Sequence, residues 1–274
     1  MRVIGICRFS YPAIGGFKRM HETVEDREAY LYATQRMELR FRHFELLTLP
    51  SIAAQKDKRF TFLVMTGERM PKPYWERLND ICAPVEQIKV ITAPPAKHRT
   101  AMQQAIQTEI GSEDTETLQF RLDDDDAVGI QFVRSIRRSA RLAWKLRSGW
   151  DNMVIEYSRG YSVKLTEDGI VAKDIQGQFL ACGLAVSFRA GESKTVMNFP
   201  HHKLHHTMPT VIDPTIPMYL RAVHEDNDSR ARGQDTALEP LTADEQRFFK
   251  SQFNVDETKV RAAFTPEPAL LGKA

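Results

Sequence analysis

The fold is decided by residues 118–126, Leu-Gln-Phe-Arg-Leu-Asp-Asp-Asp-Asp. Leu118, Phe120 and Leu122 alternate with polar residues, which is the period-two pattern of a β-strand with one buried face. The four carboxylates begin where that pattern stops. Because ligands of open α/β sheets bind outside the carboxyl ends of the strands, this junction predicts a binding site.

Strand and helix patterns alternate through the first half of the chain. Strands are predicted at residues 3–9, 60–65, 85–91 and 118–122, and helices at 27–48, 73–81, 97–110 and 129–147. Leu49-Pro50 is expected to interrupt the first helix, because proline lacks the N–H that a helix interior needs. This order predicts an α/β fold with a largely parallel sheet flanked by helices.

The second half changes to predicted hairpins, which indicates an antiparallel arrangement. Their strands are expected at 153–157, 161–165, 170–173 and 179–188, with Asp168-Gly169 as a tight turn. An ordered loop or lid is expected over 199–217, and Thr242 with Glu245 forms a capping-box pattern that opens a last helix. We therefore expect one domain over residues 1–264, with halves at about 1–150 and 151–264, and a flexible tail at 265–274.

Composition limits the classes of function. The 38 Lys and Arg residues nearly balance the 36 Asp and Glu residues, so no global field favours nucleic-acid binding. Cys7, Cys82 and Cys182 lack the spacing of a disulfide framework or zinc site and are expected to be buried. No apolar stretch approaches the roughly 20 residues of a membrane span, which predicts a cytoplasmic protein that can still bind the inner face of a membrane.

The acidic run itself predicts a cation. Four adjacent carboxylates repel one another when they are buried, and Mn²⁺ or Mg²⁺ held by carboxylates and substrate phosphates relieves that repulsion. Asp123 and Asp125 have D-x-D spacing and are expected on one side of the chain, whereas Asp126 faces away or caps the next helix. The alternative is a solvated turn whose last aspartate only caps that helix.

Several segments resemble one family. The segments are residues 122–127, Arg8-Phe9-Ser10, residues 49–55 leading into 60–62, and residues 224–229, His-Glu-Asp-Asn-Asp-Ser. In these the chain is similar to the bacterial rhamnosyltransferase family, and residues 122–127 resemble the metal-binding signature of GT-A type glycosyltransferases. The resemblance implies a GT-A-like, Rossmann-type mixed sheet with an antiparallel acceptor-side half. It also implies a nucleotide-sugar donor, with rhamnose as the candidate sugar, a glycan, polysaccharide or lipid-linked acceptor, and a divalent metal on Asp123 and Asp125.

The late segment supplies the expected catalytic groups. His224 is the candidate third metal ligand, since a neutral imidazole binds Mn²⁺. Asp226, with Glu225, is the candidate general base that deprotonates an acceptor hydroxyl. The alternative for this segment is a polar surface turn.

Further residues are predicted around the donor. Arg8 is expected either to contact the nucleobase or diphosphate or to pair with an aspartate of the cluster. Arg121 and Asp124 are expected to contact the nucleotide sugar together with Asp123. His202 and His206 are expected in a loop that touches acceptor or diphosphate, with a plain exposed loop as the alternative.

A basic stripe follows the aspartates in the helix predicted at 129–147. Its members are Arg134, Arg137, Arg138, Arg141 and Lys145. Such a stripe is either the solvated side of the helix or a surface for an anionic partner, such as membrane lipid or a charged polysaccharide.

Two rival functions stay open beside a metal-dependent glycosyltransferase. One is a metal-dependent nucleotidyltransferase, which releases pyrophosphate, and the other is a non-catalytic module that binds sugar nucleotide or glycan. The motifs of common serine hydrolases, dinucleotide-binding enzymes and P-loop NTPases are absent from the sequence.

Overall fold

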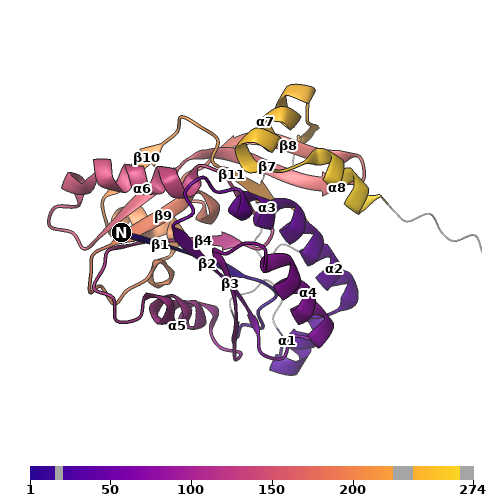
Figure 1. The fold of residues 1–274 in the computed structure, drawn as a ribbon, viewed down its shortest axis with the longest axis horizontal. Coiled ribbons are helices and arrows are strands. Elements are labelled where there is room, and N and C mark those ends of the chain that lie inside the picture. Colours follow the sequence, from indigo (N-terminus) through magenta and orange to yellow (C-terminus); the bar gives the residue numbers. More distant parts are fainter. Residues whose placement is uncertain (16–20, 225–236, 266–274) are drawn as a thin grey trace, which may run out of the picture.

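The computed structural model describes residues 1–15, 21–224 and 237–265 and contains two β-sheets (Figure 1). The larger sheet has the order β10-β6-β9-β4-β1-β2-β3 and the smaller one β12-β8-β7-β11-β5. The larger sheet consists of β1 (Arg2–Arg8), β2 (Phe60–Gly67), β3 (Ile88–Ala93), β4 (Thr117–Asp123), β6 (Asn152–Tyr157), β9 (Leu184–Phe188) and β10 (Thr210–Asp213). The smaller sheet consists of β5 (Ala127–Val128), β7 (Arg159–Thr166), β8 (Gly169–Gln176), β11 (Tyr219–Ala222) and β12 (Glu239–Pro240). Thr265 is the one described residue of the predicted tail.

Helices lie on both faces of the larger sheet, as the alternating pattern predicts. They are α1 (Val24–Leu31), α2 (Thr34–His43), α3 (Leu49–Ala53), α4 (Lys72–Cys82), α5 (His98–Ile110) and α6 (Phe132–Leu142). Apolar residues of α2, α4 and α6 share one core with the strands, and α5 packs into a second core on the opposite face. Figure 1 shows α6 above the sheet and α5 below it.

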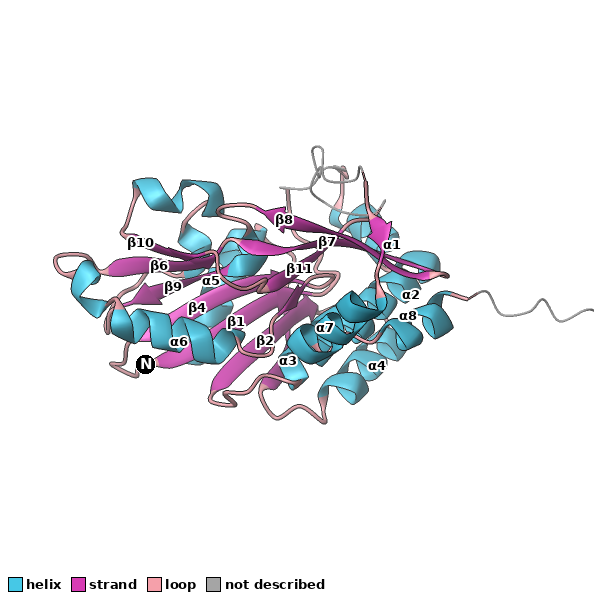
Figure 2. Ribbon diagram, turned by 90° about the horizontal axis from the view of Figure 1, so that it is seen from above, coloured by secondary structure: helices cyan, strands magenta, loops and turns pink. Residues whose placement is uncertain are grey.

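The central strands align their carboxyl ends. Strand β1 pairs in parallel with β2 on one side and with β4 on the other. This register places Arg8 beside Met65 of β2 and beside Asp123 of β4. The predicted parallel order is confirmed for these strands, and Figure 2 shows them pointing toward the same edge of the sheet.

The first predicted helix, 27–48, is divided differently from the expectation. It breaks at Tyr32 and Ala33, between α1 and α2, and then continues past Pro50 through a π-helical turn, Phe44–Thr48. In that turn the Leu49 N–H bonds to the Phe44 carbonyl. Pro50 therefore falls in the first turn of α3, where a missing N–H costs little.

The hairpins predicted for the second half are only partly correct. Strands β7 and β8 form a hairpin, but its turn lies one residue earlier than predicted, at Glu167-Asp168, because Gly169 already begins β8. Strands β6 and β9 instead pair with each other in the larger sheet, where β9 also lies antiparallel to β4. Strands β10 and β11 were not predicted, and they pair in parallel with β6 and β7, so the second half is not antiparallel throughout. Fully buried strand runs such as β6 can take either sheet position, and period alone does not decide it.

The smaller sheet is covered by the last two helices of the described chain. They are α7 (Ala243–Phe253) and α8 (Glu257–Phe264), seen in yellow in Figure 1. The predicted capping box is confirmed, since Thr242 and Glu245 bond reciprocally. Phe249, Phe253 and Val260 pack against β7, β8 and β11. Helix α8 was not predicted, because only eight residues form it.

One of the five residues of the predicted basic stripe does not lie on the exposed side of its helix. Arg137 is buried rather than exposed, and its guanidinium bonds to Asp57 at 3.0 Å and to the Arg59 carbonyl at 2.7 Å. The reason is helical spacing, because position 137 lies one turn after the buried Val133. Helix α6 also ends at Leu142, and a separate 3₁₀ helix, Trp144–Arg147, follows.

The histidine-rich segment contains regular structure instead of being loop throughout. Residues His201–His206 form a 3₁₀ helix, and β10 follows. The three cysteines are buried and free, as predicted. None of the helices in the described ranges is long and apolar enough to cross a bilayer.

Candidate functional site

The carboxyl edge of β1 and β4 holds the first pair of predicted site residues. Asp123 ends β4, and its side chain keeps 57% of its area exposed. The Arg8 guanidinium, at the end of β1, lies 3.9 Å from the Asp123 carboxylate. Of the two alternatives for Arg8, pairing with an aspartate is therefore observed. Asp123 remains the open carboxylate of the four, because the other three are buried.

Asp124 and Asp125 share a buried counter-charge from a helix. Strand β4 stops at Asp123, so the chain turns and the expected strand alternation does not reach Asp125. Arg40 of α2 donates from one nitrogen to Asp124 and to Asp125, both at 2.9 Å. A buried carboxylate needs such pairing, because its desolvation is otherwise costly.

His224 completes this network from the far side of the fold. It lies just after β11, and its Nε2 is 2.8 Å from Asp125 Oδ2. The His43 ring, from α2, lies against it with ring centroids 4.4 Å apart. His43 Nδ1 faces the Leu39 carbonyl at 2.9 Å, so the tautomer with a proton on Nδ1 satisfies that contact. Burial, with His224 nearby, lowers the pKa of His43 to about 4.

The three buried carboxyl groups have pKa values shifted in different directions. Burial raises the pKa of Asp124 to about 6, although Arg40 acts in the opposite direction. Burial also acts to raise the pKa of Asp125, but Arg40 and the His224 hydrogen bond outweigh it and hold that pKa below the usual range. For Asp126, burial and the nearby Asp125 and Asp123 hold the pKa well above the usual range. The Arg40 guanidinium thus offsets part of the repulsion that the sequence predicts.

Asp126 anchors the second sheet to the first. Its carboxyl oxygen accepts from the Ala222 N–H at 3.0 Å, and β5 begins at the next residue. It does not cap helix α6, whose N-cap position is Gln131. Asp126 therefore has a structural contact that fixes β11, and with it the approach of the chain to His224.

A cluster of basic side chains lies on the other side of Asp123. Arg121 of β4 is partly buried, and burial with the charge of Arg8 lowers its pKa despite the opposing effect of Asp123. Its Nε has no hydrogen-bond partner among the described residues. His98, at the start of α5, has a pKa lowered to about 4 by burial and then by Arg8 and Arg99. A ligand with negative charge would supply the partner that Arg121 lacks.

The predicted loop histidines lie at the surface. His202 and His206 are exposed, and the His206 ring lies against His205 at a centroid distance of 3.9 Å with the ring planes tilted by 42°. His201, in the same 3₁₀ helix, is more buried, and its Nδ1 contacts the Phe179 carbonyl. Burial, followed by the charge of Arg121, lowers the pKa of His201. His201 is thus the member of the segment that faces the Arg121 cluster.

The predicted metal ligands do not form a common coordination shell in this arrangement. Asp125 Oδ2 is already bonded to Arg40 and to His224 Nε2, while Asp123 points to solvent beside Arg8. Within residues 1–15, 21–224 and 237–265, no group of three or more His, Cys, Asp and Glu side chains is placed to hold a metal ion. The predicted bases Glu225 and Asp226 lie outside the described residues.

Arg40 and His43 are site residues that the sequence interpretation missed. Both lie in the helix predicted at 27–48, and the apolar spacing that predicts this helix does not include them. A signal was present, because Arg36, Arg40 and His43 follow helical spacing on the side that also carries Met37 and Phe41. All five are buried. Arginines repeated on an inward helical face, here Arg36 and Arg40, indicate buried acidic partners.

The comparison with protein families decides the relationship. The family described as "Putative rhamnosyl transferase" matches residues 2–236. The chain belongs to this rhamnosyl transferase family. The match confirms the resemblance predicted from the acidic segment. The mixed sheet with helices on both faces confirms the predicted α/β class of this family member.

Solved structures similar to this rhamnosyl transferase family member are remote in sequence. The crystal structure of S. aureus TarS 1–349 is 10% identical with a TM-score of 0.44, covering 81% of this chain and 60% of that chain. The structure of S. aureus TarS is 11% identical with a TM-score of 0.46, covering 81% of this chain and 37% of that chain. A third, TarS 1–349 in complex with UDP, is 10% identical with a TM-score of 0.44, covering 81% and 61%. This chain thus spans about three fifths of TarS 1–349. No protein of curated function shows significant similarity to it.

Proposed function

We propose that this protein is a glycosyltransferase that transfers a sugar, rhamnose in view of its family, from a nucleotide-sugar donor to a hydroxyl of a glycan, polysaccharide or lipid-linked acceptor. The observation that carries the proposal is the carboxyl edge of β1 and β4. There an exposed Asp123 lies beside Arg8, within the part of the chain that matches the family. The edge of a parallel sheet is where α/β enzymes bind nucleotide ligands.

The basic cluster suits a nucleoside diphosphate leaving group. As the bond between the anomeric carbon and the diphosphate breaks, negative charge grows on the phosphate oxygens. Arg8 and Arg121 can donate charge-assisted hydrogen bonds to those oxygens, and Arg121 Nε lacks any other partner among the described residues. Fixed cations that face developing charge stabilise the transition state without reorganisation.

The three buried aspartates hold the turn that positions the exposed Asp123. Arg40 holds the turn at Asp124 and Asp125, and Asp126 is tied to β11. Asp123, at the start of that turn, is thereby presented to the donor side. Asp124 is paired with Arg40 in this structure, and its contact with the sugar nucleotide stays a prediction.

Proton removal from the acceptor stays assigned to Asp226, with Glu225 as the second candidate. They follow His224, which Asp125 anchors at the edge of the site. A carboxylate there would accept the hydroxyl proton as the acceptor oxygen attacks the anomeric carbon.

A divalent cation, Mn²⁺ or Mg²⁺, also stays a prediction. Such an ion can be held by one protein carboxylate, with substrate phosphates as its remaining ligands. Asp123 can provide that carboxylate. Asp125 and His224 could join only by giving up their present contact. Titration of the transfer rate with Mn²⁺ and with a chelator measures whether the protein requires this ion.

The experiment is transfer assayed with a panel of nucleotide sugars and hydroxyl acceptors, with and without Mn²⁺, by analysis of both products. A glycosyltransferase releases nucleoside diphosphate and a glycosylated acceptor. Asp123→Ala should lower the rate about a hundredfold, whereas Asp80→Ala, a matched change at an exposed acid of α4, should leave it unchanged. Pyrophosphate release would identify a nucleotidyltransferase instead, and donor binding without turnover across the panel would identify a binding module. An unaltered rate in a folded Asp123→Ala protein would reject the assignment of this site.

A further inference from the structure

An exposed apolar surface follows helix α6, at the end of the molecule opposite the candidate site. Its residues are Leu142, Trp144, Leu146 and Trp150. Their exposed fractions are 73%, 63%, 62% and 49%, in that order. All four lie within nine sequence positions, at the end of α6 and in and after the 3₁₀ helix Trp144–Arg147. We call these four residues the apolar patch. Soluble proteins seldom expose large apolar side chains in one contiguous group without a partner for them.

Basic residues border the apolar patch. Arg134, Arg138, Arg141 and Lys145 are exposed and form no ion pair within the described residues. The sequence contains no Asp or Glu between Asp126 and Asp151. Glu116, which lines one cavity with Trp144, is paired with Arg147, and Asp151 follows Trp150 in the sequence. Excess positive charge therefore surrounds the apolar patch.

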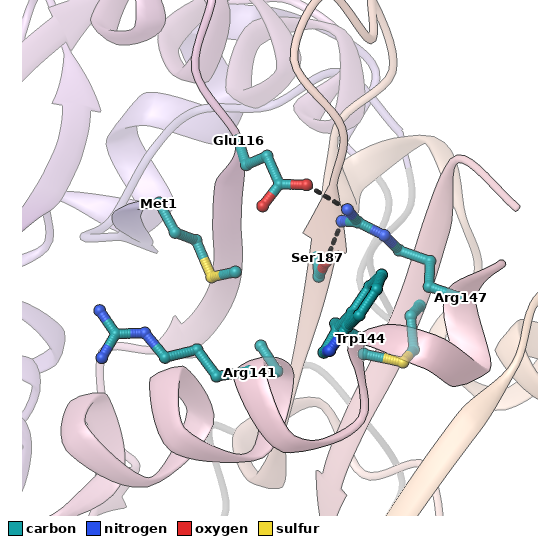
Figure 3. Close-up of a pocket in the computed structure, with 8 residues that line it drawn as sticks. Met1, Glu116, Arg141, Trp144, Arg147 and Ser187 are labelled. Atoms are coloured by element: carbon teal, nitrogen blue, oxygen red, sulfur yellow. Dashed lines mark hydrogen bonds and ion pairs between the residues drawn. The ribbon is translucent and has the colours of Figure 1, made fainter.

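Two hollows adjoin the apolar patch and share Arg141 as a wall. One is a cavity of about 170 Å³ between Met1, Glu116, Trp144 and Met153 (Figure 3). The other is an open hollow of about 470 Å³ lined by Met1, Lys58, Phe60 and Thr61, and by Arg2, Arg59, Arg137 and Arg141. Arg2 and Arg59 there are partly neutralised by Glu109 and Asp57. No acidic residue lines the second hollow itself.

We propose that the apolar patch and its basic border, Arg138, Arg141 and Lys145, form a docking surface for an anionic phospholipid bilayer. Tryptophan and leucine side chains enter the interfacial region of a bilayer, and tryptophan is favoured there because its ring is amphipathic. Arginine and lysine beside them bind anionic headgroups, and the second hollow offers room for one. A protein partner would need no such excess of one charge around the apolar centre.

The docking surface fixes the orientation of the site. Strand β1 begins at Arg2, beside the second hollow, and ends six residues later at Arg8, in the candidate site. At about 3.3 Å per residue the two ends are roughly 20 Å apart. Figure 2 shows α6 near the start of β1 and the strand pointing away from it. Bound in this way, the protein would open its site away from the lipid surface and toward acceptors that extend from it.

The experiment is vesicle sedimentation with the full chain, using phosphatidylcholine vesicles with or without phosphatidylglycerol. Its readout is binding, so its outcome is independent of the proposed transferase activity. The full chain should bind the anionic vesicles, and this binding should weaken at high salt. It should bind the neutral vesicles weakly or not at all. Trp144→Ser with Leu146→Ser, and separately Arg141→Gln with Lys145→Gln, should each weaken binding about tenfold or more. The matched control, Trp75→Ser with Lys72→Gln on α4, should bind as the original chain does.

Several results would overturn the proposal. They are no binding to anionic vesicles, equal binding to neutral vesicles, or the same loss in the control variant. The oligomeric state is measured in parallel without lipid. A dimer that the Trp144 and Leu146 changes convert to monomer would show that a second copy of the chain covers the apolar patch, and would also overturn it.

Discussion

His224 Nε2 lies 2.8 Å from Asp125 Oδ2, although the two residues are 99 positions apart in the sequence. This contact joins the end of β11 to the turn after β4. The same Asp125 oxygen accepts from Arg40 at 2.9 Å, so helix α2, the acidic turn and the late segment meet at one atom. Groups that share a buried partner are energetically coupled, and changes at any one of them should affect the others.

Loss of Arg40 should be strongly destabilising. Arg40→Gln leaves Asp124 and Asp125 buried without their cation, and removal of one partner of a buried ion pair costs about 3–5 kcal/mol. Urea unfolding followed by circular dichroism measures the change in the free energy of unfolding. Arg134→Gln, at an exposed position on α6, is the matched control and should change it by less than about 0.5 kcal/mol. Equal stability of the two variants would show that Arg40 does not support the acidic turn.

Asp124 should make stability fall as the pH rises. Its pKa in the folded protein is raised from 3.8 to about 6, so its contribution is fully present below pH 4 and is lost between pH 4 and 6. Asp124→Asn cannot ionise and should lack this loss. The free energy of unfolding, measured in urea from pH 4 to 7.5, should fall for the original chain relative to Asp124→Asn, by on the order of 3 kcal/mol. Parallel curves for the two proteins would contradict the assignment.

His43 should have the opposite effect in an overlapping range. Its pKa is lowered to about 4 in the folded protein, so the unfolded chain takes up a proton first as the pH falls. Stability from neutral His43 is therefore present above pH 6.5 and is lost as the pH falls toward 4. Relative to His43→Gln, the free energy of unfolding of the original chain should fall by on the order of 3 kcal/mol as the pH is lowered over that interval. The same urea series measures it, and a difference that stays constant with pH would show that His43 is not held neutral.

The sequence predicts the part of the fold that depends on local pattern. The strand over residues 118–122, the capping box at Thr242 and the parallel central strands all follow from periodicity, capping chemistry and chain order. The pairing of β6 with β9 does not, because a buried apolar run carries no mark of its neighbour. Sheet position is set by tertiary packing, which a single sequence does not display.

The site shows the same division. Asp123 at the end of a strand was predictable, because chain order alone places it at the ligand-binding edge. The partner of Asp125 was not, since the sequence suggested a metal ion and the fold supplies Arg40 from a helix 85 positions away. The orientation of Asp125 differs for a related reason: the strand stops at Asp123, and alternation of side chains stops with it. Whether an acid near a strand end is open or buried depends on which helix packs over the turn.

Arg121 should matter for ligand binding and little for folding. Its Nε is buried without a partner among the described residues, and burial lowers its pKa, so the ligand-free protein gains little from its charge. Arg121→Gln should leave the free energy of unfolding unchanged or raise it, while a lost charge-assisted hydrogen bond of about 1.5–3 kcal/mol should weaken nucleoside diphosphate binding about 10–100-fold. Thermal shifts with uridine, thymidine and guanosine diphosphates measure this, because ligand stabilisation grows with the logarithm of concentration over Kd. Arg189→Gln, at an exposed position after β9, serves as the control and should retain the full shift. A variant at Arg121 that is less stable without ligand, yet binds diphosphate as tightly as before, would assign this arginine to the fold and not to the donor.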